Sequence, residues 1–207
     1  MKVDLEFVDS TTDIELLLPY LREVEKDDHP AAKNMAVDGW EDNPASLLYL
    51  LYKEKRYDQE GCWYGIGKLN GEIFASGGIS RLHDSNIGII GSRGFTLKQH
   101  RNHAKYFHWM ATRCFWDTCK NYYAGYVLCY NEYNKKKAHV SVKINQDYVL
   151  DSYGYPVHRK NPERAMLPMK MYSSPVIINY TKQYVAYGSC HDDTTVRNYL
   201  DTIACDD

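Results

Sequence analysis

The sequence predicts a single α/β (α+β) domain, on three observations. Short segments that alternate apolar and polar residues, as half-buried strands do, recur along the chain. Longer segments with apolar residues at helical spacing lie between them. An Asn70-Gly71 pair separates two of the strand-like segments, as in a two-residue hairpin. The 207 residues fit one domain over 1–207, in which residues 149–207 are a C-terminal extension that could complete the sheet.

The N-terminal part predicts a strand followed by a helix. Val3–Val8 alternates apolar and polar residues, which indicates a half-buried strand. From Ile14 to Val24 the apolar residues recur at helical spacing. Pro19 lies within this helical segment. Because proline lacks a backbone N–H, it predicts either a kink or the true start of the helix.

A loop and a second helix come next in the sequence. Residues 27–44 are rich in acids and lack a periodic pattern, which indicates a loop. Asn43 followed by Pro44 is a favourable helix start. Ala45–Tyr57 then places leucines along one side, so we expect a second helix there.

The clearest local pattern is a hairpin. Cys62–Leu69 and Glu72–Leu82 predict strands, and the Asn70-Gly71 pair between them tolerates the positive φ angles of a two-residue turn. Asn86–Leu97 predicts a third neighbouring strand. Its glycines, at positions 88, 91 and 94, predict a bulge or a close backbone approach.

Helices and strands alternate again in the rest of the chain. His103–Lys120 predicts a helix, with Asn102 as its cap and a broad apolar stripe that packs on the sheet. Val176–Tyr180 and Tyr184–Tyr187 are rich in β-formers and predict a pair of strands. The remaining expectations are a strand over Ala124–Tyr130, a short helix over Asn134–Ile144, a loop over Gly154–Pro168 and a terminal helix over Val196–Ala204.

One long segment of the chain carries no acidic residue. It lies between Asp84 and Asp117, although Asp and Glu outnumber Lys and Arg overall, by 27 to 25. A helix start, expected inside this segment, offers unpaired N–H groups and the positive end of the helix dipole, each of which favours an anion by roughly 0.3 to 1 kcal/mol. The sequence therefore predicts a site for a phosphate-bearing ligand. The basic residues there are Arg93, Lys98, Arg101, Lys105 and Arg113, with His100 and His103.

Composition narrows the class of protein. A net charge of −2 argues against nucleic-acid binding driven by overall charge. Six cysteines without a CxxC pair indicate a reduced, intracellular setting. The N-terminus lacks the apolar core of a signal peptide, and no stretch approaches roughly 20 apolar residues. We therefore expect a cytoplasmic protein that does not span a membrane.

The order of elements resembles that of the GNAT superfamily of N-acetyltransferases. In that family the turn before the helix reads Arg or Gln, two variable residues, Gly, one variable residue, then Gly or Ala. Here Arg101 matches, Ala104 replaces the first glycine, and Tyr106 replaces the second small residue. Downstream, Asn134 matches an asparagine that opens the family's next helix. Ser141 stands where the family often has a catalytic tyrosine.

The resemblance spans most of residues 3–148 and implies a GNAT-like mixed, mostly antiparallel sheet flanked by helices on both faces. It also implies an acetyl-CoA-dependent N-acetyltransferase that moves an acetyl group to a primary amine of a small molecule or a protein. Acetyl-CoA would lie along the strand that ends at Leu97, with its pyrophosphate on the main chain of residues 102–106. The implied cofactor-binding residues are Phe95, Thr96, Leu97, Lys98, Arg101, Asn102, His103, Ala104, Lys105, Tyr106 and Asn134.

Acetyl transfer to an amine needs a base for the ammonium proton, an oxyanion stabiliser, and an acid for the departing thiolate. The candidate acids are Tyr130, Tyr133 and Ser141. Glu72 and Asp84, near the ends of the hairpin's second strand, are candidate bases acting through water, although the simpler interpretation is that both are ordinary exposed carboxylates. The acidic loop, residues 27–42, lies where the family shapes its acceptor pocket and would attract a cationic amine.

Other functions stay open beside acetyl transfer. A non-catalytic relative, which keeps the fold as a binding or interaction module, fits Tyr106 and Ser141 at motif positions. Nucleic-acid contact by the basic segment ranks last. No metal is expected, because neither His100 with His103 nor the Cys190–Asp193 segment has the paired spacing of a structural zinc site. The sequence leaves open which amine is the acceptor and whether the chain forms a homodimer through its C-terminal strands.

Overall fold

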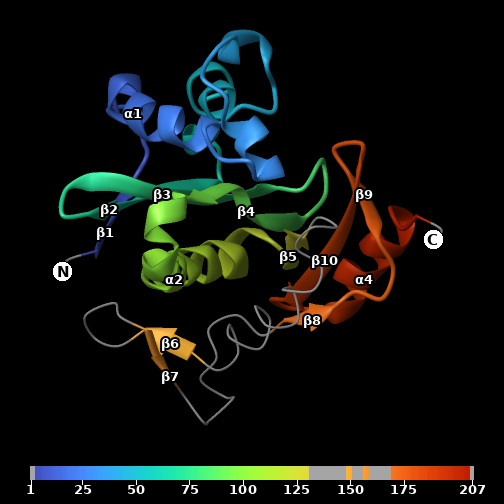
Figure 1. Ribbon diagram of the computed structural model, residues 1–207. Helices are drawn as coiled ribbons and strands as arrows, with labels where there is room; N and C mark the ends of the chain where they lie inside the picture. The colour runs from blue at the N-terminus through green and yellow to red at the C-terminus, as the bar shows by residue number, and fades with distance from the viewer. Residues whose placement is uncertain (1–2, 131–147, 151–155, 159–168, 206–207) are drawn as a thin grey trace.

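The structure, a computed structural model, describes residues 3–130, 148–150, 156–158 and 169–205 (Figure 1). Its main strands are β1 (Val3–Phe7), β2 (Trp63–Leu69), β3 (Glu72–Arg81), β4 (Ile87–Thr96), β5 (Gly125–Tyr130), β8 (Lys170–Met171), β9 (Val176–Ile178) and β10 (Thr181–Ser189). Among the described residues these strands form one sheet in the order β1-β2-β3-β4-β5-β10-β8, with β9 paired to β10 beside this path. Only β4 and β5 pair in parallel; the other pairs are antiparallel.

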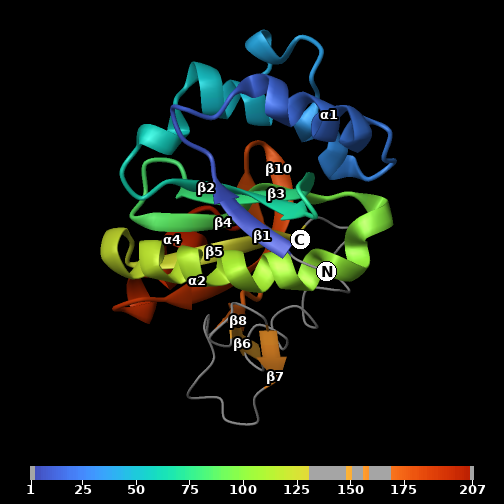
Figure 2. The ribbon, with the colours of Figure 1, turned by 90° about the vertical axis from the view of Figure 1, so that its left-hand side faces the viewer.

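Helices cover both faces of this sheet. Helix α2 (Ala104–Tyr122) lies on one face and α1 (Ile14–Glu25) on the other (Figure 2). Helix α4 (Asp193–Thr202) covers the same face as α1. Tyr126 of β5 packs with α2, whereas Val127, which points to the opposite face, packs with Val196 and Leu200 of α4. The expected mixed, mostly antiparallel sheet with helices on both faces is confirmed.

Helix α1 begins before its proline. The Asp13 carboxylate caps the helix, because its Oδ1 accepts the N–H of Glu15 at 3.0 Å. Pro19 lies inside the helix, so the expectation that Pro19 marks the helix start is wrong. The buried face carries Leu17, Tyr20, Leu21 and Val24 and packs on the sheet.

The helix expected over Ala45–Tyr57 is confirmed only in part, because helical backbone covers residues 47–53 and then stops. Asn43 does cap this segment, since its Oδ1 accepts a backbone N–H two residues on at 3.0 Å. A π-helix, Tyr49–Lys53, then forms and ends near Lys55, which adopts a left-handed conformation with φ of +51°. That conformation interrupts the helical backbone and starts a 3₁₀ helix, Arg56–Asp58. The sequence pattern located the buried leucines but not this break.

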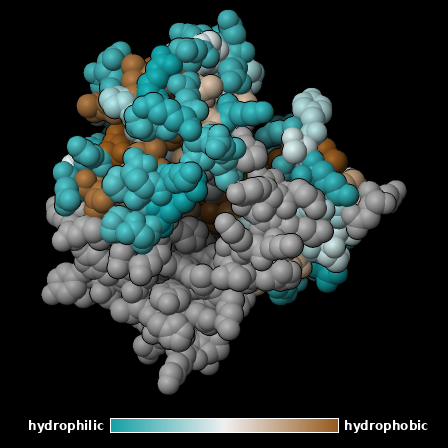
Figure 3. All heavy atoms as spheres, viewed as in Figure 1, coloured by the Kyte–Doolittle hydropathy of each residue, from teal (hydrophilic) through white to brown (hydrophobic). Residues whose placement is uncertain are grey.

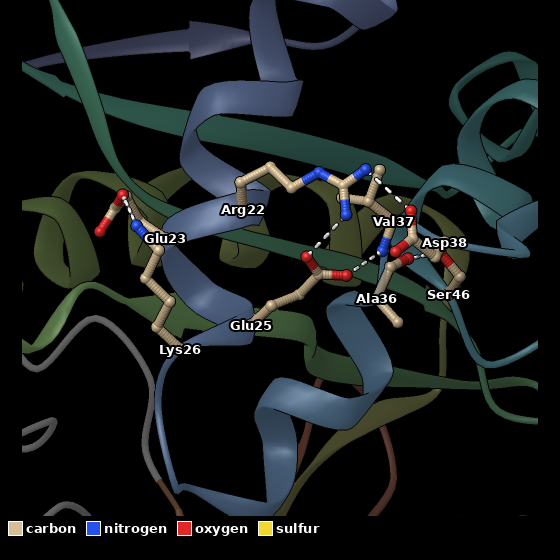
Figure 4. Close-up of polar contacts among 8 residues, drawn as sticks. All are labelled: Arg22, Glu23, Glu25, Lys26, Ala36, Val37, Asp38 and Ser46. Carbon is tan, nitrogen blue, oxygen red and sulfur yellow. Dashed lines mark hydrogen bonds and ion pairs between the residues drawn. The ribbon is translucent and has the colours of Figure 1, made fainter.

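The acidic segment before it, expected to be a loop, contains two 3₁₀ helices, Pro30–Met35 and Trp40–Asp42. Ion pairs at the end of α1 hold it in place (Figure 4). Arg22 bridges Glu25 at 3.1 Å and Asp38 at 2.8 Å. The second oxygen of Glu25 accepts the N–H of Val37 at 2.7 Å. Arg22 also holds the pKa of Asp38 below its usual value.

The predicted hairpin is confirmed. Strands β2 and β3 pair antiparallel, and the turn residues Asn70 and Gly71 have φ angles of +53° and +94°. The predicted bulge in β4 is confirmed as well, because the register of β4 against β3 shifts twice along the pair. Within the bulge Gly91 has φ of +76° and Arg93 has φ of +52°.

A buried tyrosine connects α1 to the bulge. The Tyr20 hydroxyl donates to the carbonyl of Phe95 at 2.9 Å and lies 2.9 Å from the Ser76 hydroxyl. Ser76 in turn donates to the carbonyl of Arg93 at 3.1 Å. Through these contacts α1, β3 and the bulged part of β4 share one hydrogen-bonded network.

The C-terminal elements extend the sheet beyond β5. Strands β9 and β10 pair as predicted, and the turn residues Asn179 and Tyr180 have φ of +51° and +61°. The terminal helix is α4, which the Asp192 carboxylate caps by accepting the N–H of Thr194 at 2.9 Å.

Two expectations concern the segment between β5 and β8. The loop expected over Gly154–Pro168 is wrong at one point, because β7 (Pro156–His158) pairs antiparallel with β6 (Tyr148–Leu150). Cross-strand pairing thus overrides the turn preference of its proline. The helix expected over Asn134–Ile144 lies outside the described residues.

We expect Tyr20→Phe to lower the free energy of unfolding by about 1 to 2 kcal/mol, because the buried carbonyl of Phe95 loses its donor. Urea unfolding followed by circular dichroism measures this change. Tyr180→Phe is the matched control, since the Tyr180 side chain is fully exposed and its hydroxyl supports no buried contact. Equal losses in the two variants would contradict the role given to Tyr20.

Candidate functional site

Strands β4 and β5 separate in the middle of the sheet. Their parallel pairing runs from Ile87 with Gly125 to Ile90 with Leu128 and then stops. Strand β4 continues to Thr96 but pairs only with β3 over this second half, among the residues that the structure describes. The bulge at Gly91 and Arg93 begins where the pairing ends. One edge of β4 therefore presents backbone groups that no described strand uses.

A cavity of about 930 Å³ opens on the α1 side of the sheet beside this separation. Its floor is β4 and β5, including Gly91 and Leu128. Its walls are the π-helix and 3₁₀ segment after α1 on one side and the β9–β10 hairpin on the other. The outer surface of the helical layer beside it is largely hydrophilic (Figure 3). The volume suits a ligand larger than a simple amine.

Charged side chains line much of the cavity. Glu54 and Arg56 form an ion pair with an N–O distance of 2.7 Å, and each is about one-third exposed. Burial lowers the pKa of Arg56, but the hydrogen bond and charge of Glu54 outweigh this effect and raise it. Arg81 donates to the carbonyl of Ser85 at 3.2 Å and lies over the ring of Tyr123 at 5.4 Å. These two cations of the wall are thus partnered.

Arg93 differs from them. Its Nε atom is buried and has no hydrogen-bond acceptor, and its guanidinium forms no ion pair with any residue that the structure describes. Burial lowers the pKa of Arg93, an effect that the charges of Tyr64 and Glu54 oppose and that of Arg56 reinforces. Its backbone also has the positive φ of the bulge, which costs roughly 1 to 3 kcal/mol for a residue with a side chain.

Two thiols line the cavity, and burial acts on both. Burial raises the pKa of Cys129 to about 12 and raises that of Cys62 as well. Both groups therefore stay protonated at neutral pH, whereas a cysteine nucleophile must be a thiolate. The cavity does not provide an activated thiol in the described part of the chain.

The predicted anion site lies at the start of α2. A 3₁₀ helix, Lys98–His103, connects β4 to α2, and the N-cap is His103 rather than Asn102. The expectation that Asn102 caps the helix is wrong, because the 3₁₀ turn already supplies an acceptor: the N–H of Ala104 bonds to the Arg101 carbonyl. Helix geometry then leaves the N–H groups of Lys105 and Tyr106 without an acceptor inside the helix.

The surroundings of this helix start are open. Lys98, Gln99, Arg101 and Asn102 are exposed. Arg101 is not a free cation, since it pairs with Asp27 at 2.8 Å, and the Asp27 side chain is only 10% exposed. Among the described side chains of the 3₁₀ turn, Lys98 is thus an exposed cation for which no ion pair is found.

The other cofactor-binding candidates occupy several places. Phe95 and Leu97 are buried in the core beside α1, so only their main chain could contact a ligand, and Thr96 lies between them. Tyr130 is 7% exposed, packs in the core at the end of β5 and does not line the cavity. Tyr133, Asn134 and Ser141 lie outside the described residues.

Of the acidic residues that the sequence analysis proposed for the site, some line the cavity and others do not. Asp84 lines the cavity, whereas Glu72 begins β3 at the other end of the strand, beside the hairpin turn. None of the acids between Asp27 and Asp42 lines the cavity. Sequence reasoning missed Arg56 as a site residue. It named Arg93 among the basic residues of the predicted phosphate site, but not as a residue of this cavity.

Other interpretations gain no structural support. Within the described ranges, no three His, Cys, Asp or Glu side chains gather closely enough to hold a metal ion. His191 lies 3.2 Å from the carbonyl of Lys120. Asp192 caps α4. None of the described helices has the length and apolarity needed to cross a bilayer. A cytoplasmic location and a homodimer stay predictions from the sequence.

Comparison with known proteins identifies the fold. No protein-family model matches the sequence, and no curated protein matches it. Solved structures do match. An acetyltransferase from Streptococcus agalactiae aligns with a TM-score of 0.54 over 90% of this chain and 98% of its own, at 11% identity. A GNAT-family acetyltransferase from Streptococcus pneumoniae gives a TM-score of 0.53 over 91% and 99%, at 11% identity.

A third structure is the spermidine N-acetyltransferase from Vibrio cholerae in complex with CoA and spermine. It aligns with a TM-score of 0.51 over 90% of this chain and 95% of its own, at 10% identity. Identities this low show the architecture and not the activity. The chain has the fold of the GNAT acetyltransferases.

We expect iodoacetamide at pH 8 to leave Cys62 and Cys129 unmodified in the folded protein, because burial raises the pKa of both thiols and so disfavours the reactive thiolate. Mass spectrometry of tryptic peptides measures the labelling. The same chain unfolded in urea is the control and should be labelled at both positions. Rapid labelling of Cys129 in the folded protein would contradict the conclusion that the cavity holds no reactive thiol.

Proposed function

We propose that the protein is an acetyl-CoA-dependent N-acetyltransferase that transfers the acetyl group directly to a primary amine. The observation that carries this proposal is the separation of β4 from β5 next to a 930 Å³ cavity. The unpaired edge of β4 offers main-chain groups to an extended ligand, and the cavity offers space for an acceptor at the same point. The shared fold supports the assignment as an acyltransferase.

The helix start after β4 supports the proposed binding of acetyl-CoA. The N–H groups of Lys105 and Tyr106 and the helix dipole favour a pyrophosphate there. Lys98 adds an exposed positive charge. Arg101 contributes less than the family motif suggests, because Asp27 already neutralises it.

The proposed reaction takes place where β4 and β5 separate. The neutral amine attacks the thioester carbonyl, a tetrahedral oxyanion forms, and the thiolate of CoA leaves with a proton. Backbone N–H groups along the unpaired edge of β4 would stabilise the oxyanion. Asp84, which lines the cavity, is the proposed base through water. Direct transfer fits the thiols of the cavity, because their raised pKa values disfavour the thiolate that an acyl-enzyme needs.

The proton for the thiolate has three candidate donors. Tyr130 lies on β5 beyond its last pair with β4, and Tyr133 and Ser141 are proposed from the family resemblance. Asn134 is proposed, on the same ground, to orient the thiol arm of the cofactor. A non-catalytic binding module stays the second candidate function, because Tyr106 stands at a motif position that normally holds a small residue.

The first test is binding. We expect acetyl-CoA to bind the wild-type protein in calorimetry, and Lys98→Glu to weaken the affinity at least about tenfold, which corresponds to about 1.4 kcal/mol. The cause is repulsion between the new carboxylate and the phosphates. Lys120→Glu is the matched control, since Lys120 is an exposed lysine at the opposite end of α2, and it should change the affinity less than about twofold.

The second test is turnover. Release of free CoA, measured by chromatography, should depend on an added amine. Binding of acetyl-CoA without any amine-dependent release would favour the non-catalytic module. No binding at millimolar acetyl-CoA by a folded sample would reject both the enzyme and the cofactor assignment.

A further inference from the structure

The charges of the cavity wall bear on the chemistry of the acceptor, an inference that rests on the proposed function. Glu60 and Asp84 line the cavity but are exposed, so water screens their charges. Glu54 is only one-third exposed, and it already pairs with Arg56 at 2.7 Å. Among the described residues, the wall thus holds no buried carboxylate that is free to bind a cationic ligand.

The cationic residues of the cavity wall differ from one another in their partners. Arg81 is partnered by the Ser85 carbonyl and the Tyr123 ring, and Arg56 by Glu54. Arg93 alone, among the described cations of the wall, has neither an ion pair nor an acceptor for its buried Nε. A guanidinium without an ion pair in a partly buried position is unfavourable, because burial removes its water while Glu54, the carboxylate whose charge reaches it, is already paired with Arg56.

Backbone strain at the same residue is an independent observation. Arg93 has φ of +52°, a conformation in which glycine or asparagine is far less strained than arginine. Arg93, which lines the cavity, therefore combines two energetic costs: a partly buried guanidinium and a strained backbone conformation. Strained residues of this kind cluster at ligand-binding sites.

We propose that the amine acceptor carries an anionic group, a carboxylate or a phosphate, and that the Arg93 guanidinium binds it. A guanidinium presents a planar pair of N–H donors that matches either anion. Arg93 lies two residues from Gly91, where β4 and β5 separate, so the anion binds near the reacting amine. Short amino acids and phosphorylated amines have this arrangement of groups, whereas polyamines do not.

Matched pairs of acceptors test the proposal. The first pair is 4-aminobutanoate and 4-aminobutanamide, which differ in the carboxylate and keep the amine distant from it. The second pair is O-phosphoethanolamine and ethanolamine, and spermidine represents polycations. We expect kcat/KM for CoA release to be at least about tenfold higher for the anionic member of one pair, and that pair identifies the anion as carboxylate or phosphate. A preference for spermidine or for both neutral members would overturn the proposal.

Variants of Arg93 assign the effect to the side chain. In Arg93→Gln the preference for the anionic member should fall to within about threefold, through a higher KM, while the affinity for acetyl-CoA stays the same. Arg93→Lys should restore part of the preference, because it returns the charge without the planar pair of donors. Arg197→Gln, an exposed arginine of α4 outside the cavity, is the matched control and should behave as the wild type. An unchanged preference in Arg93→Gln would exclude Arg93 as the anion-binding group.

Calorimetry separates this inference from the proposed function. With CoA present, 4-aminobutanoate or O-phosphoethanolamine should bind the wild-type protein and not Arg93→Gln. If no amine releases CoA but this binding difference is found, acetyl transfer fails and the anion site stands. If neither anionic amine binds the wild type at about 10 mM while acetyl-CoA does, the anion site fails and the cofactor assignment stands.

Discussion

The bulge in β4 is the constraint on which the rest of the structure depends. Once the strand bends at Gly91 and Arg93, it cannot continue its parallel ladder with β5, and the two strands part. Tyr20 and Ser76 hold the bent backbone by binding the carbonyls of Phe95 and Arg93. Buried hydrogen bonds on the α1 side of the sheet therefore stabilise the bent conformation of β4, and with it the separation of β4 from β5.

The cavity follows from how the two faces are covered. Helix α2 packs along one face, but the opposite face is covered by α1 near β2 and β3 and by α4 near β5 and β10. Two separate apolar clusters form under these helices, and the cavity is lined by residues of both clusters and of the bulge. Irregular helices and the β9–β10 hairpin make its walls. Such segments can change length and charge without disturbing the sheet, so they can set specificity while the fold stays the same.

Much of this fold could be predicted from local patterns. Asn70-Gly71 fixed the hairpin, because few other pairs adopt two positive φ angles, and the glycines of β4 located the bulge. The helix expected over residues 45–57 is shorter than predicted, for a different reason. Leucine spacing reports burial, but the left-handed backbone of Lys55, an exposed residue, leaves no mark in that spacing.

The site was harder to predict than the fold. The basic segment before α2 was visible as a gap in the acids, yet the sequence could not tell that Arg101 would pair with Asp27, 74 residues away. Pairings over such a distance decide which charges remain available to a ligand. The same holds for Arg56, which forms an ion pair with Glu54, and for Arg93, which forms no ion pair with any described residue.

The ligand that this cavity favours thus depends on which of its charged side chains lack a partner, and not on how many acidic and basic residues the sequence contains. The loop of acids after α1 would attract a cationic acceptor if its carboxylates faced the cavity. Asp27 and Asp38 instead bind Arg101 and Arg22, and the acids of this loop do not line the cavity. A side chain that served folding alone would gain stability at position 93 from a smaller, neutral residue, since both burial and positive φ disfavour arginine. The energetic cost of Arg93 is understandable if a ligand anion completes its coordination, and this argument links the bulge that opens the sheet to the chemistry of the molecule bound beside it.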